Sequence, residues 1–326
     1  MRPELFYTPT KRDLLKLTGK DRQSFLQGMV TNDVLRLQPS EGCYAFMLDA
    51  TAHILADMRV LNVGDCLLLD LEPGTAPFVA ETLDKYLIME KCRIADVTAS
   101  YGCFSIGGER SGDYFRDNSS VADAGRWQNN QSVVLSDDSI LSRIDIASIP
   151  LYRLYFPNPR NMDVAYMPRN EKGETEAELP ESTLDALRIE AGIPRFGVDL
   201  DKTVLAPEAR QDGRAVSYKK GCYIGQEIVA RIDARGHTNK GLVGFLLDPA
   251  QTALPEYDAP IFVSGTGDGK PVGRITSAAM SPTLGIPIAL GYLRNEHATS
   301  DTRLAVGSPD GAAVRVAALP FGESAK

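Results

Sequence analysis

The segment best suited to chemistry is residues 219–236, which reads KKGCYIGQEIVARIDARG. It places Cys222 after two lysines, between two glycines and before a helix-like run that begins near Gln226. Nearby cations and a helix N-terminus both stabilise a thiolate, so Cys222 is the cysteine whose setting favours reactivity. The alternative is a small buried residue in a tight turn, with the lysines as a solvated face.

The other thiols and the histidines indicate no metal or redox motif. The five cysteines include no CxxC pair, and the three histidines offer no HExxH spacing. We therefore expect no metal site and a reducing, cytosolic compartment. Burial is the better interpretation for the cysteines in apolar or strand-like settings, which are Cys43, Cys66, Cys92 and Cys103.

Charge and length exclude several classes of protein. The chain has 326 residues and a formal net charge of -8, which argues against a broad nucleic-acid surface. Residues 188–240 hold ten Lys or Arg against seven Asp or Glu, so a local cationic face is expected there. No apolar stretch approaches the ~20 residues needed to cross a bilayer, and we expect neither a signal peptide nor a membrane anchor.

Several elements are expected to position these residues. Residues 44–48 and 54–61 are strand-like and separated by a hairpin-length loop. Period-2 alternation puts Asp57 and Arg59 on one face of the second strand. A helix is predicted from Ser182 to about Ala191, and Glu190 lies in its last turn, where a carboxylate opposes the helix dipole. That position hints at another role for Glu190.

The C-terminal part has a different pattern. After residue 240 come short apolar runs separated by Pro and Gly, which predict a small β-barrel or sandwich of about 85 residues. The run Gly265, Gly267, Gly269 and Lys270 lacks the Walker spacing and a following helix, so we interpret it as a hairpin turn. The prediction is an α+β protein with domains at 1–240 and 241–326.

The segment KGCYIGQEIVAR, residues 220–231, resembles the signature of the YgfZ group of folate-binding proteins. These are relatives of the glycine-cleavage T protein, an aminomethyltransferase. Further segments agree in order and spacing, and the resemblance spans nearly the whole chain. They are FLQGMVTNDV at 25–34, RIEAGIPRFGVDL at 188–200, VGRITSAAMSP at 272–282 and IALGYL at 288–293.

The resemblance implies intertwined α+β subdomains and a C-terminal β-barrel around a central opening that binds tetrahydrofolate or a one-carbon folate. Glu190 would then meet the pteridine ring, because a carboxylate accepts hydrogen bonds from ring donors. The glutamate tail would be held by basic residues such as Lys220, Arg231 and Arg235, and the sequence does not fix which of them does so. Other binding residues implied by the matched motifs are Asn32, Gly221, Gln226 and Glu227.

One departure from the aminomethyltransferases concerns the reaction. Their strand carries paired glycines and then two adjacent aspartates, whereas residues 52–57 here read AHILAD, which leaves only Asp57. The hairpin tip at Ala52 and His53 is also unusual for the YgfZ group, which usually has Gly and a basic residue there. Losing a carboxylate placed against the folate puts amine transfer in doubt.

Three functions follow as hypotheses. In the first, the protein is a folate-dependent accessory factor that supports assembly or repair of iron–sulfur enzymes, including those that thiolate tRNA. Cys222 would then act on a partner protein, a cluster or a folate adduct, and the partners would be iron–sulfur proteins or their assembly factors. The alternative is a tetrahydrofolate-dependent aminomethyl or one-carbon transferase that uses Asp57. The third is a structural scaffold without folate affinity.

Overall fold

The computed structural model describes residues 4–118, 121, 123–144, 146, 149–157, 167–170, 172–236, 238–249, 253–265, 269–299 and 302–322. It divides into two compact units, each made of two stretches of chain. Unit 1 comprises Met1–Glu181 and Gln211–Gln226, and unit 2 comprises Ser182–Arg210 and Glu227–Lys326. The chain therefore passes between the units three times. Among the helices described, none is long and apolar enough to span a membrane.

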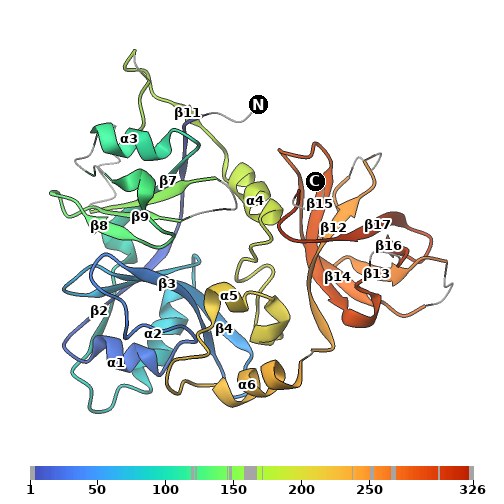
Figure 1. Cartoon of the computed structure of the whole chain (residues 1–326), viewed down its shortest axis with the longest axis horizontal. Coiled ribbons are helices and arrows are strands. Elements are labelled where there is room, and N and C mark those ends of the chain that lie inside the picture. Colours follow the sequence, from blue (N-terminus) through green and yellow to red (C-terminus); the bar gives the residue numbers. More distant parts are fainter. Residues whose placement is uncertain are drawn as a thin grey trace. The chain divides into compact units, whose positions relative to one another are not determined.

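The first sheet of unit 1 has five strands in the order β3-β4-β5-β2-β6 (Figure 1). Its outer face carries an aliphatic cluster that packs against α1 and α2. The strands alternate inward and outward side chains with period 2, so the opposite face is free to meet another layer. The bounds are β2 Asp13–Thr18, α1 Arg22–Gln27, β3 Gly42–Leu48, β4 Ile54–Asn62, β5 Leu67–Leu71, α2 Ala76–Asp84 and β6 Arg93–Asp96.

The second sheet of unit 1 has six strands in the order β11-β1-β7-β10-β9-β8. One of its faces is covered by α3, where Phe104, Phe115 and Tyr152 form the centre of an aromatic cluster. The bounds are β1 Phe6–Pro9, β7 Tyr101–Gly107, α3 Ser111–Asn118, β8 Ser132–Val134, β9 Ile140–Arg143, β10 Leu151–Pro157, β11 Ala177–Glu178 and α5 Asp212–Ala215. Short 3₁₀ turns lie at Thr98–Ser100 and Ala124–Arg126.

The two sheets of unit 1 face each other. A buried cluster joins Leu14, Leu61 and Leu68 of the five-stranded sheet to Ile140 and Tyr155 of the six-stranded sheet. Both sheets thus bury one face against the other and the second face against helices, as layered domains require. The space between the sheets also contains the charged residues described below.

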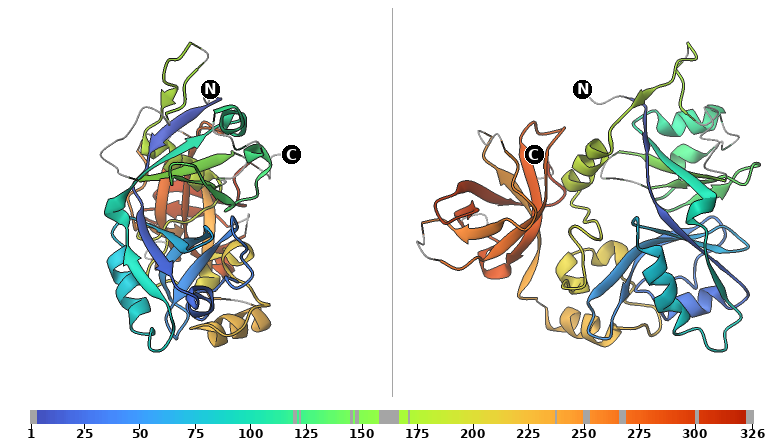
Figure 2. Two further views of the ribbon diagram at one scale, coloured as in Figure 1. Left: turned by 90° about the vertical axis from the view of Figure 1, so that its left-hand side faces the viewer. Right: turned by 180° about the vertical axis from the view of Figure 1, so that it is seen from behind.

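Unit 2 is built on a closed barrel of six strands, β12-β15-β14-β13-β16-β17 (Figure 2). Its interior is filled by residues such as Phe245, Ile275 and Leu293. Closure of the sheet leaves no open edge. The bounds are α4 Glu181–Glu190, α6 Gln226–Arg235, β12 Lys240–Leu247, β13 Pro260–Val263, β14 Gly273–Met280, β15 Pro287–Arg294, β16 Leu304–Val306 and β17 Ala312–Ala317, with 3₁₀ turns at Ala206–Ala209 and Asn295–His297.

The predicted fold class, α+β with a C-terminal barrel, is confirmed. One detail differs. The helix predicted from Ser182 begins one residue earlier, at Glu181. The domain boundary at 240 stays a prediction. The proposed turn around Gly267 lies partly outside the described residues.

Candidate functional site

Cys222 is exposed and stands in the bend that leads into α6. The other four cysteines are buried or half-buried. Burial raises the pKa of the Cys43 and Cys103 thiols to about 12 and that of Cys66 to about 11. Cys222 is therefore the thiol that a reagent or a partner protein reaches from solvent.

Lys220 points into unit 1. Its ammonium donates to the carbonyl oxygens of Gln27 and Val30, both at 2.5 Å, and of Asn32 at 3.0 Å. Because burial removes water from the charge, the pKa of Lys220 falls to about 8. An ammonium has three hydrogens, and all three have acceptors here. Lys220 thus anchors segment 219–225 to the loop after α1. The expected contact with a glutamate tail stays a prediction.

Asn32 is likewise engaged within unit 1. Its amide nitrogen donates to the carbonyl oxygens of Tyr44 at 2.8 Å and Arg214 at 2.9 Å, while its oxygen accepts from the amide of Asp33. The side chain therefore ties β3 to α5. The predicted role in folate binding stays a prediction, and the positioning of β3 is what the geometry supports.

The remaining residues predicted around Cys222 follow it along the chain. Gly221 is exposed, with no atom within 4 Å of the place a Cβ would occupy. Gln226 is half-buried at the start of α6, whereas Glu227 and Arg231 are exposed. Arg235 is the last residue of α6, and its side chain lies outside the described part. By the division into units, Gln226 ends the last stretch of unit 1, and the residues from Glu227 onward belong to unit 2.

Asp57 occupies a buried site between the sheets of unit 1. Tyr44 donates its hydroxyl to Asp57 Oδ2 at 2.7 Å. Burial and, second to it, the nearby Glu72 carboxylate raise the pKa of Asp57 to about 6, against the lowering effects of the Tyr44 hydrogen bond and of Arg12 and Arg59. A carboxyl group with a pKa near 6 exchanges a proton readily at neutral pH, which is what a general acid or base requires.

Two arginines lie against the ring of Tyr44, the residue that donates to this carboxyl group. The guanidinium of Arg214 stacks over the Tyr44 ring at 4.7 Å, and that of Arg59 lies 5.9 Å from the same ring. Asp57 and Arg59 share a face of β4, as the alternation predicted. They are two residues apart on β4, and their register partners Phe46 and Tyr44 are likewise two residues apart on β3. Arg59 Nη1 also donates to Asn130 Oδ1 at 2.6 Å.

A second carboxylate, Asp70, is buried beside them and was missed at the level of the sequence. Arg12 Nε and Arg153 Nη1 both donate to it at 2.5 Å, and the Tyr155 hydroxyl donates at 2.7 Å. Burial alone would raise the pKa of Asp70, yet the two guanidinium groups hold it well below its usual range. The available signal was one aspartate inside the apolar strand LLLDL, since buried charges require partners.

Glu190 lies in unit 2 and is 7% exposed. Its Oε1 accepts from the Ser281 hydroxyl and from the Thr283 amide at 2.8 Å, and its Oε2 accepts from the Thr283 hydroxyl at 2.9 Å. The carboxylate at the end of α4 thus caps the turn after β14. This explains its unfavourable place in the helix without a ligand, and the predicted pteridine contact remains untested.

The helix α4 makes further bonds to β14. Arg188 pairs with Asp199 and donates to Ser277 Oγ at 2.7 Å, and Asp199 accepts from the hydroxyls of Thr276 and Ser277. The RIEAG and ITSAAMSP segments, nearly ninety residues apart in sequence, are therefore one bonded assembly in unit 2.

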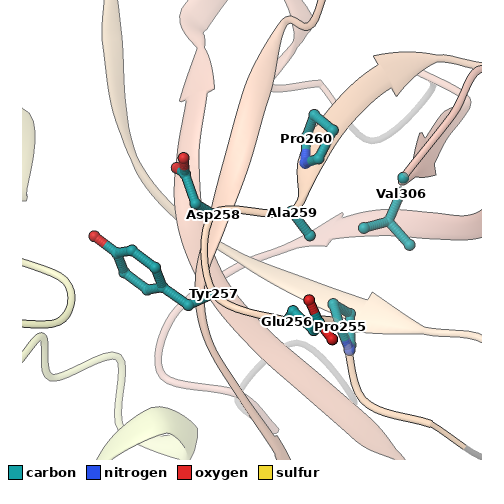
Figure 3. A pocket seen from close by; sticks show the side chains of 8 residues that line it. Pro255, Glu256, Tyr257, Asp258, Ala259, Pro260 and Val306 are labelled. Atoms are coloured by element: carbon teal, nitrogen blue, oxygen red, sulfur yellow. The ribbon is translucent and has the colours of Figure 1, made fainter.

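An open depression of about 430 Å³ lies on the barrel at residues 255–260, Val306 and Gly307 (Figure 3). Asp258, which lines it, pairs with Arg274 at 2.9 Å. None of the residues predicted to be catalytic or folate-binding lines it. Among the residues that the structure describes, no group of three His, Cys, Asp or Glu side chains is arranged to hold a metal ion.

Two family descriptions match this chain. Residues 12–146 match the GCVT N-terminal domain, and residues 240–322 match the glycine cleavage T-protein C-terminal barrel domain. An aminomethyltransferase from Saccharopolyspora erythraea is 26% identical over 314 residues, covering 94% of this chain and 83% of its own length. A putative chloroplastic transferase from Arabidopsis thaliana is 24% identical over 301 residues, covering 90% and 66% respectively.

A solved structure gives the same fold. The crystal structure of the glycine cleavage system aminomethyltransferase T from Bartonella henselae superposes with a TM-score of 0.80 and 19% identity. The match covers 99% of this chain and 87% of that one. At this identity the likeness concerns the fold alone.

Proposed function

Because the chain is a GcvT-like protein that combines the N-terminal and C-terminal barrel domains of the glycine cleavage T-protein, we propose that it binds tetrahydrofolate or a one-carbon folate. We further propose that it is a cytosolic accessory protein of the YgfZ group. It would support assembly or repair of iron–sulfur enzymes, including those that thiolate tRNA, and its partners would be those enzymes or their assembly factors.

The observation that carries this proposal is the exposure of Cys222 on a segment that is fixed at both ends. Lys220 anchors the segment before the thiol through three carbonyl oxygens, and Gly225 packs against the β3–β4 turn after it. An exposed thiol on a pre-organised segment suits reaction with a second macromolecule, because little ordering remains to be done on contact. The four other thiols are less accessible.

The test combines folate binding with rescue in cells. Calorimetry with tetrahydrofolate should show binding to both the wild-type and the Cys222→Ser protein. Cells lacking the protein should regain iron–sulfur enzyme activity with the wild type and not with Cys222→Ser. Full rescue by the serine variant would remove the thiol from the function and leave the folate pocket to account for it.

A second candidate, a folate-dependent aminomethyl or one-carbon transferase, is favoured by one observation. Asp57 is buried against Tyr44 and has a pKa raised to about 6 by burial, which suits proton transfer. Several relatives are named aminomethyltransferases. A steady-state assay with tetrahydrofolate and an aminomethyl-lipoyl donor separates the two: turnover that is lost in Asp57→Asn supports the transferase, and no turnover in the wild type rejects it.

A further inference from the structure

The space between the two sheets of unit 1 contains a row of polar side chains that the proposed function does not use. In the six-stranded sheet, five residues are successive register partners and so point to the same face, with neighbouring Cβ atoms ~5 Å apart. Four of the five are almost fully buried and one is a half-buried arginine. In order across the strands they are Thr8, Ser105, Arg153, Ser142 and Ser132.

Part of this row lacks hydrogen-bond partners. Within the described residues, four atoms of this row are buried without one, namely Thr8 Oγ1, Ser132 Oγ, Ser142 Oγ and Arg153 Nε. Ser132 is 2% exposed and Ser142 is fully buried. A buried hydroxyl left unpaired costs about 1–3 kcal/mol, so two adjacent ones indicate that something polar lies against them.

The five-stranded sheet presents Arg59 opposite these hydroxyls. Arg59 pairs in register with Asp70, which is bonded to Arg153, and at the other end Arg59 is bonded to Asn130, two residues before Ser132. Ser142 lies between Arg153 and Ser132 in its own sheet. Two contacts thus join the sheets on either side of Ser142: Asp70 with Arg153, and Arg59 with Asn130. Arg59 takes part in the second contact and is the register partner of Asp70 in the first, which brings its guanidinium towards Ser142.

Charge in this space is unbalanced towards positive. Among the described residues, Arg59 has no carboxylate within 4.0 Å, although it is mostly withdrawn from water. Burial and the neighbouring Arg153 and Arg214 lower its pKa to about 10, so it stays charged at neutral pH. The contacts around Tyr44 and Asp70 bring together four arginines and three carboxylates. The arginines are Arg12, Arg59, Arg153 and Arg214, and the carboxylates are Asp57, Asp70 and Glu72.

We propose that unit 1 binds a small oxyanion, a carboxylate or phosphate group, between its sheets, held by Arg59 and Arg153 and by the hydroxyls of Ser132 and Ser142. A planar guanidinium and two hydroxyls are donors that match such oxygens. One negative charge balances the surplus, which a water molecule does not. The inference rests on contacts within unit 1 alone and does not depend on folate binding.

The test is a titration of the full chain with sodium acetate and, separately, sodium phosphate, at constant ionic strength and pH 7.5. We expect saturable binding by calorimetry and a rise in Tm of on the order of 2–4 °C at saturation. The tighter of the two probes identifies the class of anion. No binding of either probe to the wild type overturns the proposal.

Variants assign the binding to this place. Arg59→Gln should weaken the anion at least tenfold, Arg59→Lys should be intermediate, and Ser132→Ala and Ser142→Ala should each weaken it about threefold to tenfold. Ser111→Ala is the matched control, because Ser111 is a buried serine of unit 1 whose hydroxyl donates to the Gly108 carbonyl. It should lower Tm and leave anion affinity unchanged. Equal affinities in the wild type, Arg59→Gln and the two serine variants would place the anion elsewhere and reject the assignment.

Discussion

Gly225 lies directly against Asp49: a Cβ at position 225 would stand 2.6 Å from the Asp49 carbonyl oxygen. The backbone of Gly225 also has a φ of +85°, in the left-handed region that favours glycine. Segment 219–225, which carries Cys222, is therefore fitted to the β3–β4 turn at a point where no side chain has room.

Gly225→Ala should destabilise the protein by about 2–3 kcal/mol, because it combines a backbone clash with an unfavourable φ. Urea denaturation measures the loss. Gly221→Ala is the control in the same segment, since nothing lies within 4 Å of its Cβ position and its φ is not in the left-handed region. Equal stability of the two variants would contradict the close approach.

Lys220→Met should lower stability by about 2–4 kcal/mol, because it leaves buried carbonyl oxygens at residues 27–32 unpaired. Lys219→Met should have little effect, as Lys219 is exposed. Thermal unfolding of the two variants provides the comparison. If Lys220 served a ligand instead, Lys220→Met would keep the wild-type Tm and lose only affinity.

Asp57→Asn should stabilise the protein at neutral pH. The pKa of Asp57 rises from 3.8 to about 6 on folding, mainly through burial, so the charged form opposes folding. The folded state binds this proton more tightly than the unfolded state, and stability falls as pH rises from about 4 to about 6. Above pH 6 the penalty is about 3 kcal/mol.

Denaturation at pH 5.0 and 7.5 checks this sign. The advantage of Asp57→Asn over the wild type should be larger at pH 7.5 than at pH 5.0. Glu81→Gln, at an exposed position of α2, should show no such change. A smaller advantage at the higher pH would mean that Asp57 is stabilised in its charged form.

Glu190→Ala should cost about 1–3 kcal/mol of stability even without a ligand, because Ser281 and Thr283 lose their acceptor. If Glu190 also meets the pteridine ring, tetrahydrofolate affinity should fall as well. Measuring both quantities on one variant separates the roles. An unchanged affinity together with lower stability assigns Glu190 to the turn after β14 alone.

Cys222 should be the first thiol alkylated by iodoacetamide at neutral pH, because it is exposed and the other four are buried or half-buried. Mass spectrometry of a time course identifies the order. Cys222→Ser should leave stability within about 0.5 kcal/mol of wild type. Faster modification of Cys43 or Cys92 would show that local opening, rather than static exposure, governs reactivity.

Local patterns in the sequence predicted the parts of the fold that depend on local physics. Alternation along 54–61 correctly placed Asp57 and Arg59 on one face of β4. The helix predicted from Ser182 to about Ala191 corresponds to α4, Glu181–Glu190, and Gly192, with a φ of +69°, lies just after its end.

Long-range partners were not predictable in this way. The orientation of Lys220 depends on three carbonyl oxygens about 190 residues earlier, and no pattern near Lys220 encodes them. The buried Asp70 required two arginines from distant parts of the chain, Arg12 just before β2 and Arg153 in β10. At the tip of the β3–β4 turn, Ala52 has a φ of +67°, a conformation that glycine adopts without strain and alanine rarely adopts. An alanine at this position therefore did not predict the observed turn.

The order in which the two units use the chain constrains how the protein is made. Unit 1 is complete only when residues 211–226 have been added, after the first stretch of unit 2 has already been synthesised. Until then the carbonyl oxygens of Gln27, Val30 and Asn32 lack the Lys220 ammonium as their donor, and β3 lacks its contacts with α5. A nascent chain that has reached residue 181 therefore contains the strands of both sheets of unit 1 but lacks α5 and the segment that carries Lys220.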